Sequence, residues 1–156
     1  MQTSRRDFSM LLASALALRS TGALAKDTAL PVPTSLPKAA LAAKAQGHPL
    51  VLLISLPGCV YCELVRRSYL MPLLPESGLQ AFQLDVSNRS TVVMGFDGKP
   101  INAAAQAKAW GVTFTPTVLF LGSQGQELAE RLVGIAVPDF YGAYLDQRLA
   151  AARKLI

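Results

Sequence analysis

The chain has 156 residues, of which 51% are hydrophobic and 16% are charged, with a formal net charge of +5. These values suit one compact globular domain and exclude an intrinsically disordered chain. Beyond the first 25 residues the cations are scattered, and only Arg66-Arg67 and Arg153-Lys154 are adjacent. Since a nucleic-acid-binding surface needs clustered cations, we expect no nucleic-acid partner.

An export signal is predicted at the N-terminus, over residues 1–25. A basic start is followed by an apolar stretch from Phe8 to Leu18, and Ala23-Leu24-Ala25 has small residues at positions −3 and −1 of a signal peptidase site. The apolar stretch is much shorter than the roughly 20 residues of a membrane-spanning helix. We therefore expect cleavage after Ala25 and a location in the periplasm.

Two adjacent arginines indicate the export route. The segment Ser4-Arg5-Arg6-Asp7-Phe8 resembles the Ser-Arg-Arg-x-Phe pattern of the twin-arginine signal. Ser9-Met10 stands where that signal usually has Leu and Lys. The general secretory route is therefore the alternative.

The exported chain is predicted to begin with an extended lead-in over residues 26–37, because this segment contains three prolines. The Ala-rich segment 38–46 predicts a helix that ends at Gly47. Residues 50–56 are rich in branched aliphatic side chains, which predicts a buried strand. His48, the only histidine, is interpreted as a solvent-facing loop residue.

The strongest chemical signal follows this strand, where Pro57-Gly58 breaks the apolar run and Cys59 and Cys62 come three residues apart. Residues 63–70 predict a helix with Cys59 at its N-terminus. There the free backbone N–H groups and the positive end of the helix dipole favour a thiolate over a thiol. Cys62, one turn further along, is expected to be the shielded partner that closes the disulfide. The pattern predicts a redox site.

The next elements are less sharply marked. Residues 71–78 contain two prolines and a glycine and predict an irregular exit from the Cys helix. A second strand is predicted over residues 80–86. Two interpretations stay open for residues 87–100, which form either a short hairpin centred on Asp97-Gly98 or an inserted loop.

A second short motif, Thr115-Pro116, stands directly before an apolar segment. Asn102 is expected to cap an Ala-rich helix that runs to about Trp110, and residues 117–121 then predict a strand. Residues 127–133 are expected to return as its antiparallel partner. A proline is tolerated at the start of a strand because its missing N–H group is not needed there.

The last predicted element is a helix that begins near Pro138 and carries Phe140, Tyr144, Leu145 and Leu149 at helical spacing. The predicted order is therefore helix, strand, Cys helix, strand, helix, strand, strand, helix.

This order, with Cys59-Val-Tyr-Cys62 after the first central strand and Thr115-Pro116 before the third, resembles the thioredoxin superfamily. The resemblance covers roughly residues 36–151. It implies an α/β thioredoxin fold, with a central mixed four-stranded sheet flanked by helices, in a domain over residues 38–153. It also implies that Pro116 is a cis-proline that faces the two cysteines.

Within the superfamily the chain is most similar to the exported thioredoxin-like proteins of bacterial sulfur-oxidation gene clusters, the SoxW and SoxS type. Three segments carry this narrower resemblance, namely Pro57–Cys62, Phe96–Gly98 and Gly111–Thr117. It implies an enzyme that keeps the thiols of exported partner proteins reduced, including a carrier of sulfur intermediates. It also implies a membrane thiol-electron donor.

The implied activity is thiol–disulfide exchange, with Cys59, Cys62 and Pro116 as catalytic residues. The Cys59 thiolate would attack a disulfide of the substrate protein, and Cys62 would then resolve the mixed disulfide. Thr115 would pair through its backbone with an extended substrate, and Tyr61 would shape the substrate-binding surface.

Two departures from cytoplasmic thioredoxins bear on this mechanism. Gly58 stands where these proteins usually have Trp before the first cysteine, and residues 50–56 hold no counterpart of their buried acid. A different proton acceptor for Cys62 is therefore implied. Glu63 is adjacent in sequence but is expected to point elsewhere.

Other functions are compatible with the same pattern. The sequence does not fix the reduction potential, so an oxidant of folding substrates or an isomerase-like folding factor is an alternative. A non-catalytic thioredoxin-like binding domain with a structural disulfide is another, although Cys-x-x-Cys closes a loop too small to restrict the unfolded chain much. Two thiols supply only half of a metal site, so we expect no metal and no cofactor. We also expect a monomer.

Overall fold

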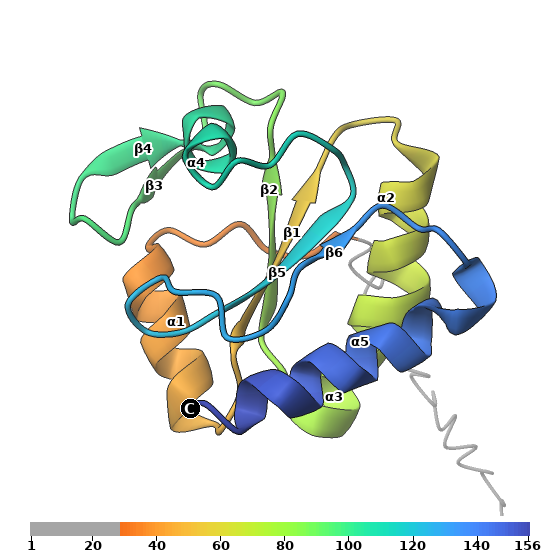
Figure 1. The fold of residues 1–156 in the computed structure, drawn as a ribbon. Coiled ribbons are helices and arrows are strands. Elements are labelled where there is room, and N and C mark those ends of the chain that lie inside the picture. The colour runs from red at the N-terminus through yellow and green to blue at the C-terminus, as the bar shows by residue number, and fades with distance from the viewer. Residues whose placement is uncertain (1–28) are drawn as a thin grey trace, which may run out of the picture.

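The computed structural model describes residues 29–156, so the predicted signal over residues 1–25 lies outside the described residues. A four-stranded sheet runs through the centre in the order β2-β1-β5-β6 (Figure 1). Strand β1 pairs parallel with β2 and antiparallel with β5, and β5 pairs antiparallel with β6. The mixed sheet of the predicted thioredoxin fold is confirmed. Its strands are Leu50–Ser55 (β1), Ala81–Asp85 (β2), Thr117–Leu121 (β5) and Leu132–Val133 (β6).

Helices cover both faces of this sheet, which makes the domain α/β (Figure 1). On one face lie α1 (Leu36–Ala45) and α4 (Ala103–Ala109). On the other lie α2 (Val60–Leu64), the π-helical segment η1 (Val65–Leu70), α3 (Met71–Ser77) and α5 (Pro138–Arg153). None of the helices within residues 29–156 has the length and apolar character needed to cross a membrane.

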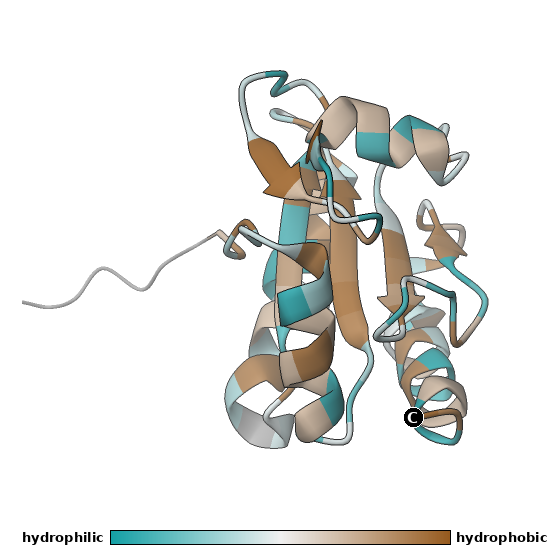
Figure 2. Cartoon of the chain, turned by 90° about the vertical axis from the view of Figure 1, so that its left-hand side faces the viewer, coloured by the Kyte–Doolittle hydropathy of each residue, from teal (hydrophilic) through white to brown (hydrophobic). Residues whose placement is uncertain are grey.

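The core has two layers, one on each face of β1. All six residues of β1 are buried, and alternate side chains point to opposite faces, as in any strand. Val51 and Leu53 join the layer under α5, while Leu52 and Ile54 join the layer under α1 and α4. Burial on both sides explains why this strand reads as a continuous apolar run (Figure 2).

The N-terminal part of the domain differs slightly from the prediction. Helix α1 begins at Leu36, two residues before the predicted start, because Ser35 caps it and its hydroxyl accepts a hydrogen bond from the Lys38 N–H at 3.4 Å. Pro37 fits in the first turn, where no N–H group is needed. Upstream, the Pro31 carbonyl accepts a hydrogen bond from the Gln83 N–H at 2.9 Å, so the lead-in lies along the outer edge of β2.

The prediction of an irregular exit over residues 71–78 is wrong. The Cys helix continues through η1 and α3 to Ser77, with Pro75 inside it. In η1 the hydrogen bonds reach five residues back, as in the bond from the Met71 N–H to the Arg66 carbonyl. Pro72 stands where the hydrogen bonds return from five residues back to the usual four residues back. Because Pro72 has no N–H group, this change in hydrogen bonding accommodates a proline that would otherwise break the helix.

The hairpin is the correct one of the two interpretations for residues 87–100. Strand β3 (Val92–Met94) pairs antiparallel with β4 (Pro100–Asn102), and Asp97-Gly98 lies in the turn between them.

By contrast, only part of the predicted strand 127–133 pairs with β5. Leu132 and Val133 form β6, while Glu127 makes a single bridge to Leu121 and the residues between leave the ladder.

Helix α5 starts at Pro138 as predicted, but its buried face is rotated from the expected one. Tyr141, Leu145 and Leu149 pack into the core, whereas Phe140 and Tyr144 are exposed. Tyr141 packs against Tyr69 of η1 with 4.8 Å between the ring centroids and the ring planes tilted by 51°. Its hydroxyl is buried without a hydrogen-bond partner among the described residues.

We expect the substitution Tyr141→Phe to change how stability depends on pH. Burial raises the pKa of Tyr141 above its ordinary value of 10.0. The unfolded chain therefore loses this proton above about pH 10 while the folded protein retains it, so stability falls as the pH rises above that value. Tyr141→Phe should remove this part of the alkaline loss in urea unfolding curves. At neutral pH the variant should be as stable as wild type or about 1 kcal/mol more stable, because an unpaired buried hydroxyl is gone.

The control is Tyr144→Phe, since Tyr144 is an exposed tyrosine of the same helix. This variant should keep the full alkaline loss of the wild type. An unchanged alkaline loss in Tyr141→Phe would contradict the explanation.

Candidate active site

The turn after β1 places the first cysteine at the start of a helix. The Cys59 N–H donates a hydrogen bond to the Leu56 carbonyl at 3.3 Å, which closes a four-residue turn. Gly58 adopts a φ of +71°, a left-handed conformation that suits glycine and strains other residues. Helix α2 then begins at Val60, three residues earlier than predicted, with Cys59 as its N-cap. The predicted position of Cys59 at a helix N-terminus is thus confirmed.

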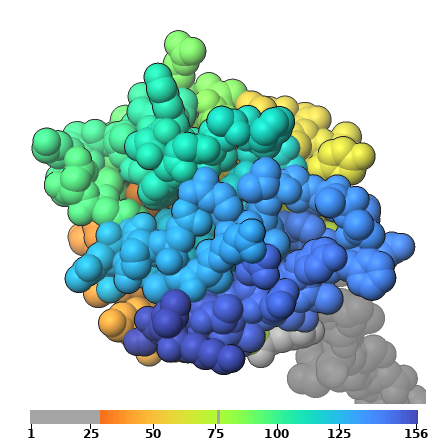
Figure 3. Space-filling view, in the orientation of Figure 1, coloured from red at the N-terminus to blue at the C-terminus, as the bar shows by residue number. Residues whose placement is uncertain are grey.

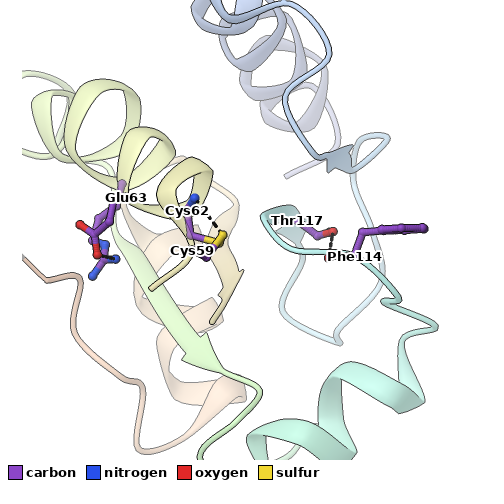
Figure 4. The surroundings of a disulfide bond; sticks show 6 residues. Cys59, Cys62, Glu63, Phe114 and Thr117 are labelled. Atoms are coloured by element: carbon purple, nitrogen blue, oxygen red, sulfur yellow. Dashed lines mark hydrogen bonds and ion pairs between the residues drawn. A yellow bond between two sulfur atoms is a disulfide. The ribbon is translucent and has the colours of Figure 1, made fainter. Parts of the chain in front are cut away.

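Cys59 and Cys62 form a disulfide with their Cα atoms 5.2 Å apart, a usual separation for such a bond. The Cys62 N–H donates to the Cys59 Sγ at 3.2 Å (Figure 4). Cys62 is 0% exposed, whereas Cys59 is partly accessible. Only Cys59 can therefore meet a partner molecule, and after reduction its sulfur has a backbone donor and a helix N-terminus to stabilise negative charge.

The Thr115-Pro116 segment lies at the same end of the central strands as this turn. Ile54, near the end of β1, is paired with Thr117 at the start of antiparallel β5. The Thr115–Pro116 peptide bond is cis, as the resemblance implies. Pro116 is buried, and its carbonyl accepts a hydrogen bond from the Gly134 N–H at 2.8 Å. In Figure 4 the disulfide faces the segment that carries Phe114 and Thr117.

The two residues predicted to bind substrate lie in different places. Thr115 is next to the cis-proline, and its backbone N–H and C=O have no hydrogen-bond partner within residues 29–156. Tyr61 is on α2 between the cysteines, with its side chain 57% exposed. The structure thus brings Thr115 and Pro116 to the Cys turn and leaves Tyr61 on the outer surface beside it.

Glu63 follows Cys62 directly but is turned toward two arginines. Its carboxylate lies 2.5 Å from the Arg66 Nη2 and 3.2 Å from the Arg67 Nε, on the side of α2 away from the disulfide (Figure 4). The expectation that Glu63 points elsewhere is confirmed. No aspartate or glutamate occurs among the buried residues of the described part of the chain, so the structure has no buried acid near Cys62.

Sequence reasoning missed the apolar surface around the turn. Phe114 lies directly before Thr115 and is 68% exposed, and Leu56 and Val60 are exposed as well. Thr117 fixes the backbone beside Phe114, because its hydroxyl donates to the Phe114 carbonyl at 2.8 Å. A large apolar residue inside a loop just before Thr115-Pro116 was the signal that could have revealed this surface.

Comparison with known proteins agrees with the geometry. The family profile described as Thioredoxin-like domain matches residues 36–149. The chain belongs to the thioredoxin-like family. The match includes both cysteines and Pro116, so this thioredoxin-like protein carries its Cys-x-x-Cys disulfide and its cis-proline inside the family domain.

Solved structures support the fold. Mitochondrial thioredoxin 3 from Saccharomyces cerevisiae is similar with a TM-score of 0.51 at 20% identity, covering 78% of this chain and 93% of the yeast chain. Thioredoxin O2 from Arabidopsis thaliana is similar with a TM-score of 0.52 at 15% identity, covering 77% and 94%. No curated protein sequence matches the chain. At these identities the structures show the shared fold alone.

Proposed function

We propose that the protein is a periplasmic thiol–disulfide oxidoreductase that reduces disulfides in exported partner proteins. One observation carries the proposal: a helix-capping disulfide with one accessible sulfur, on Cys59, and one buried sulfur, on Cys62. A disulfide that closes so short a loop adds little stability, so its value lies in reactivity. The neighbouring Thr115-Pro116 segment supplies unpaired backbone groups where a substrate polypeptide would lie.

The reaction starts from the reduced dithiol. The Cys59 thiolate attacks one sulfur of the substrate disulfide, which forms a mixed disulfide and releases the first substrate thiolate. The Cys62 sulfur then attacks the Cys59 Sγ, which releases the second substrate sulfur and closes the Cys59–Cys62 disulfide. Two electrons pass to the substrate, whose sulfurs take up two protons, one from the Cys62 thiol and one from solvent.

The enzyme must then be reduced again. A membrane-bound dithiol donor would return two electrons by the same exchange in reverse.

Because Glu63 is paired with Arg66 and Arg67, the proton that leaves Cys62 during resolution passes to the departing substrate sulfur or to water. The cycle as proposed uses the two cysteines of one protomer, the substrate disulfide and the dithiol of the donor.

The cellular setting rests on sequence. The twin-arginine pattern over Ser4–Phe8 and the cleavage site at Ala25 support export to the periplasm. The resemblance of Pro57–Cys62, Phe96–Gly98 and Gly111–Thr117 to the SoxW and SoxS type supports a role in sulfur oxidation. There the enzyme would keep the thiol of a sulfur-carrying protein reduced.

The reduction potential of the Cys59/Cys62 pair tests the proposal. When the purified protein is equilibrated with dithiothreitol buffers of known composition, we expect the pair to have a reduction potential near that of thioredoxin, about −270 mV. A value near about −120 mV would identify an oxidant of folding substrates instead. If the pair exchanged with neither dithiothreitol nor glutathione, the disulfide would be structural and the proposal would be wrong.

A further inference from the structure

A buried serine lies at the end of β1, and the exchange chemistry described so far does not use it. Ser55 is 4% exposed, and its hydroxyl has no hydrogen-bond partner within residues 29–156. Its carbonyl accepts a hydrogen bond from the Val86 N–H at 3.0 Å, which fixes the backbone at this position. Buried polar groups normally have a hydrogen-bond partner, so we expect this hydroxyl to find one in another state of the protein.

The alternation of β1 turns the Ser55 side chain toward α2 and η1. Side chains two residues apart in a strand point to the same face of the sheet. Val51 and Leu53 belong to the core layer that also contains Val65 of η1, so Ser55 points to the side of that layer. Ile54, which lies between Leu53 and Ser55, belongs to the opposite layer.

The same face of the sheet carries Pro116 beside Ser55. Ile54 of β1 is paired with Thr117 of antiparallel β5. The next pair in this register is Ser55 and Pro116, and residues opposite each other in two strands share a face. Figure 3 shows the Cys turn (residues 56–59), in yellow, at the surface next to the teal segment that leads to Pro116. Ser55 therefore lies beneath the place where these two segments meet.

The helix presents Cys62 to this part of the sheet. Cys62 and Val65 are three residues apart, so they lie on the same face of the helix. Val65 packs in the layer that contains Leu53, and Cys62, which is 0% exposed, is one turn closer to the Cys turn. Ser55 is likewise two residues closer to the Cys turn than Leu53. The hydroxyl on the sheet and the Cys62 sulfur on the helix are therefore at the same level of the core.

Resolution of a mixed disulfide changes what the Cys62 sulfur can accept. A sulfur in a thiol or a disulfide is a weak hydrogen-bond acceptor. When Cys62 loses its proton, its sulfur carries a negative charge, and hydrogen bonds to charged acceptors are about twice as strong as those to neutral ones. A hydroxyl that is unpaired in the disulfide form is free to donate such a bond.

The titratable groups around this position are already engaged or stay neutral. Asp85 of β2 is paired with Ser55 in register, but its Oδ1 accepts hydrogen bonds from the N–H and the hydroxyl of Ser87 at 2.8 Å and 2.7 Å. Glu63 of α2 is held by ion pairs with the two arginines of η1. Strand β5 has no charged residue. Helix α5 packs Tyr141 into the same layer, and burial raises the pKa of this tyrosine, so it stays neutral.

We infer that the Ser55 hydroxyl donates a hydrogen bond to the Cys62 sulfur when that sulfur becomes a thiolate in the resolving step. The inference rests on the proposed oxidoreductase function and adds a residue to its second step. Ser55 takes up no net proton, because the Cys62 proton still passes to the departing substrate sulfur or to water. The Cys62 sulfur then attacks the Cys59 Sγ, and the substrate sulfur leaves with the electron pair of the bond that breaks.

The substitution Ser55→Ala tests the inference, because it removes the hydroxyl and adds no bulk. The reduced protein is mixed with excess dithiobis(nitrobenzoate), an aromatic disulfide that releases a coloured thiolate. The first equivalent of colour reports the attack by Cys59, and the second reports resolution by Cys62. Because resolution is unimolecular, the rate of the second phase should not depend on the concentration of the reagent.

The expected result is a shift in the pH profile of the second phase. A hydrogen bond to a charged group favours the charged form, so Ser55→Ala should raise the pH midpoint of this phase by about one unit. Below the midpoint the thiolate fraction falls about tenfold, while the more basic thiolate is about threefold more reactive. The second phase should therefore slow about threefold at neutral pH and become about threefold faster where the thiol is fully ionised. The first phase should be unchanged.

Two further variants make the result specific. Ser55→Thr keeps a hydroxyl at the same position and should retain the pH midpoint of the wild type. Asp85→Asn removes the charge of the carboxylate that is paired with Ser55 in register, and it should also retain that midpoint.

The contrary outcomes are distinct. An unchanged midpoint in Ser55→Ala would overturn the inference and leave the oxidoreductase proposal standing. A second phase that is slower at every pH, with no shift of its midpoint, would also overturn it, because the cause would then be altered packing. A shift of equal size in Asp85→Asn would assign the effect to the carboxylate and overturn it as well. If wild type released no second equivalent of colour, Cys62 would not resolve the mixed disulfide, and the proposed function itself would fail.

Discussion

Replacing Cys59 by serine is expected to lower disulfide turnover by about three orders of magnitude or more, a loss typical of removing an enzyme's nucleophile. Cys59 has the accessible sulfur of the pair, and Cys62 is buried, so no other cysteine within residues 29–156 can meet a substrate. A serine hydroxyl stays protonated at neutral pH and cannot form a disulfide. The measurement is the rate of insulin disulfide reduction with dithiothreitol as the electron donor.

The matched control is Val60→Ser, a substitution of the neighbouring residue in the same turn. The Val60 side chain is exposed, so its replacement should leave the fold unchanged. The turnover should stay within about threefold of wild type. Thermal unfolding of Cys59→Ser should be compared with that of reduced wild type, since both lack the disulfide. Retention of more than about a tenth of the turnover by Cys59→Ser would contradict the mechanism.

The sequence was sufficient for those parts of the site that depend on local signals. Pro57-Gly58 ends an apolar run, and a helix must start soon afterwards, so the helix-capping position of Cys59 follows from the order of residues. Thr115-Pro116 before a strand is equally local. The two motifs meet because β1 and β5 are adjacent and antiparallel. The resemblance to thioredoxins implied that Pro116 faces the two cysteines, but no local pattern predicted this pairing of strands.

Features that depend on the third dimension could not be predicted in the same way. Apolar residues at positions 140, 141, 144, 145 and 149 fit more than one face of α5, and packing against the core, including Tyr69, selects the face with Tyr141. The helical path through Pro72 and Pro75 depends on the wider turn of η1, for which a proline pattern gives no signal.

The apolar surface of the site shows the same limit. Phe114 is a large apolar residue of the kind usually found in a core, and only its place in a loop directly before Thr115-Pro116 indicates a surface position. Its exposure results from the way the loop is held, with the Phe114 carbonyl bonded to the Thr117 hydroxyl and the chain turning into buried Pro116. The exposure of Phe114 therefore depends on loop geometry, whereas the Cys59–Cys62 disulfide involves two cysteines that a sequence pattern can find.

Replacing Cys62 by serine is expected to trap the enzyme on its substrate as a stable mixed disulfide. Cys59 keeps its exposed sulfur and its place at the helix N-terminus, so the first attack still occurs. The second attack cannot occur, because Cys62 is the other member of the pair and no free cysteine exists among the described residues. A disulfide-bearing protein should therefore remain bound to the variant in non-reducing gel electrophoresis, and dithiothreitol should release it.

The doubly substituted protein, Cys59→Ser with Cys62→Ser, is the control, and it should form no such complex. The trapping experiment also tests the order of attack, because Cys62 is 0% exposed and should not reach a substrate when Cys59 is absent. A mixed disulfide formed by Cys59→Ser alone would show that Cys62 becomes accessible on reduction, and the assignment of the two roles would have to be exchanged. A complex formed only by Cys62→Ser makes Cys59 the attacking residue and Cys62 the resolving one.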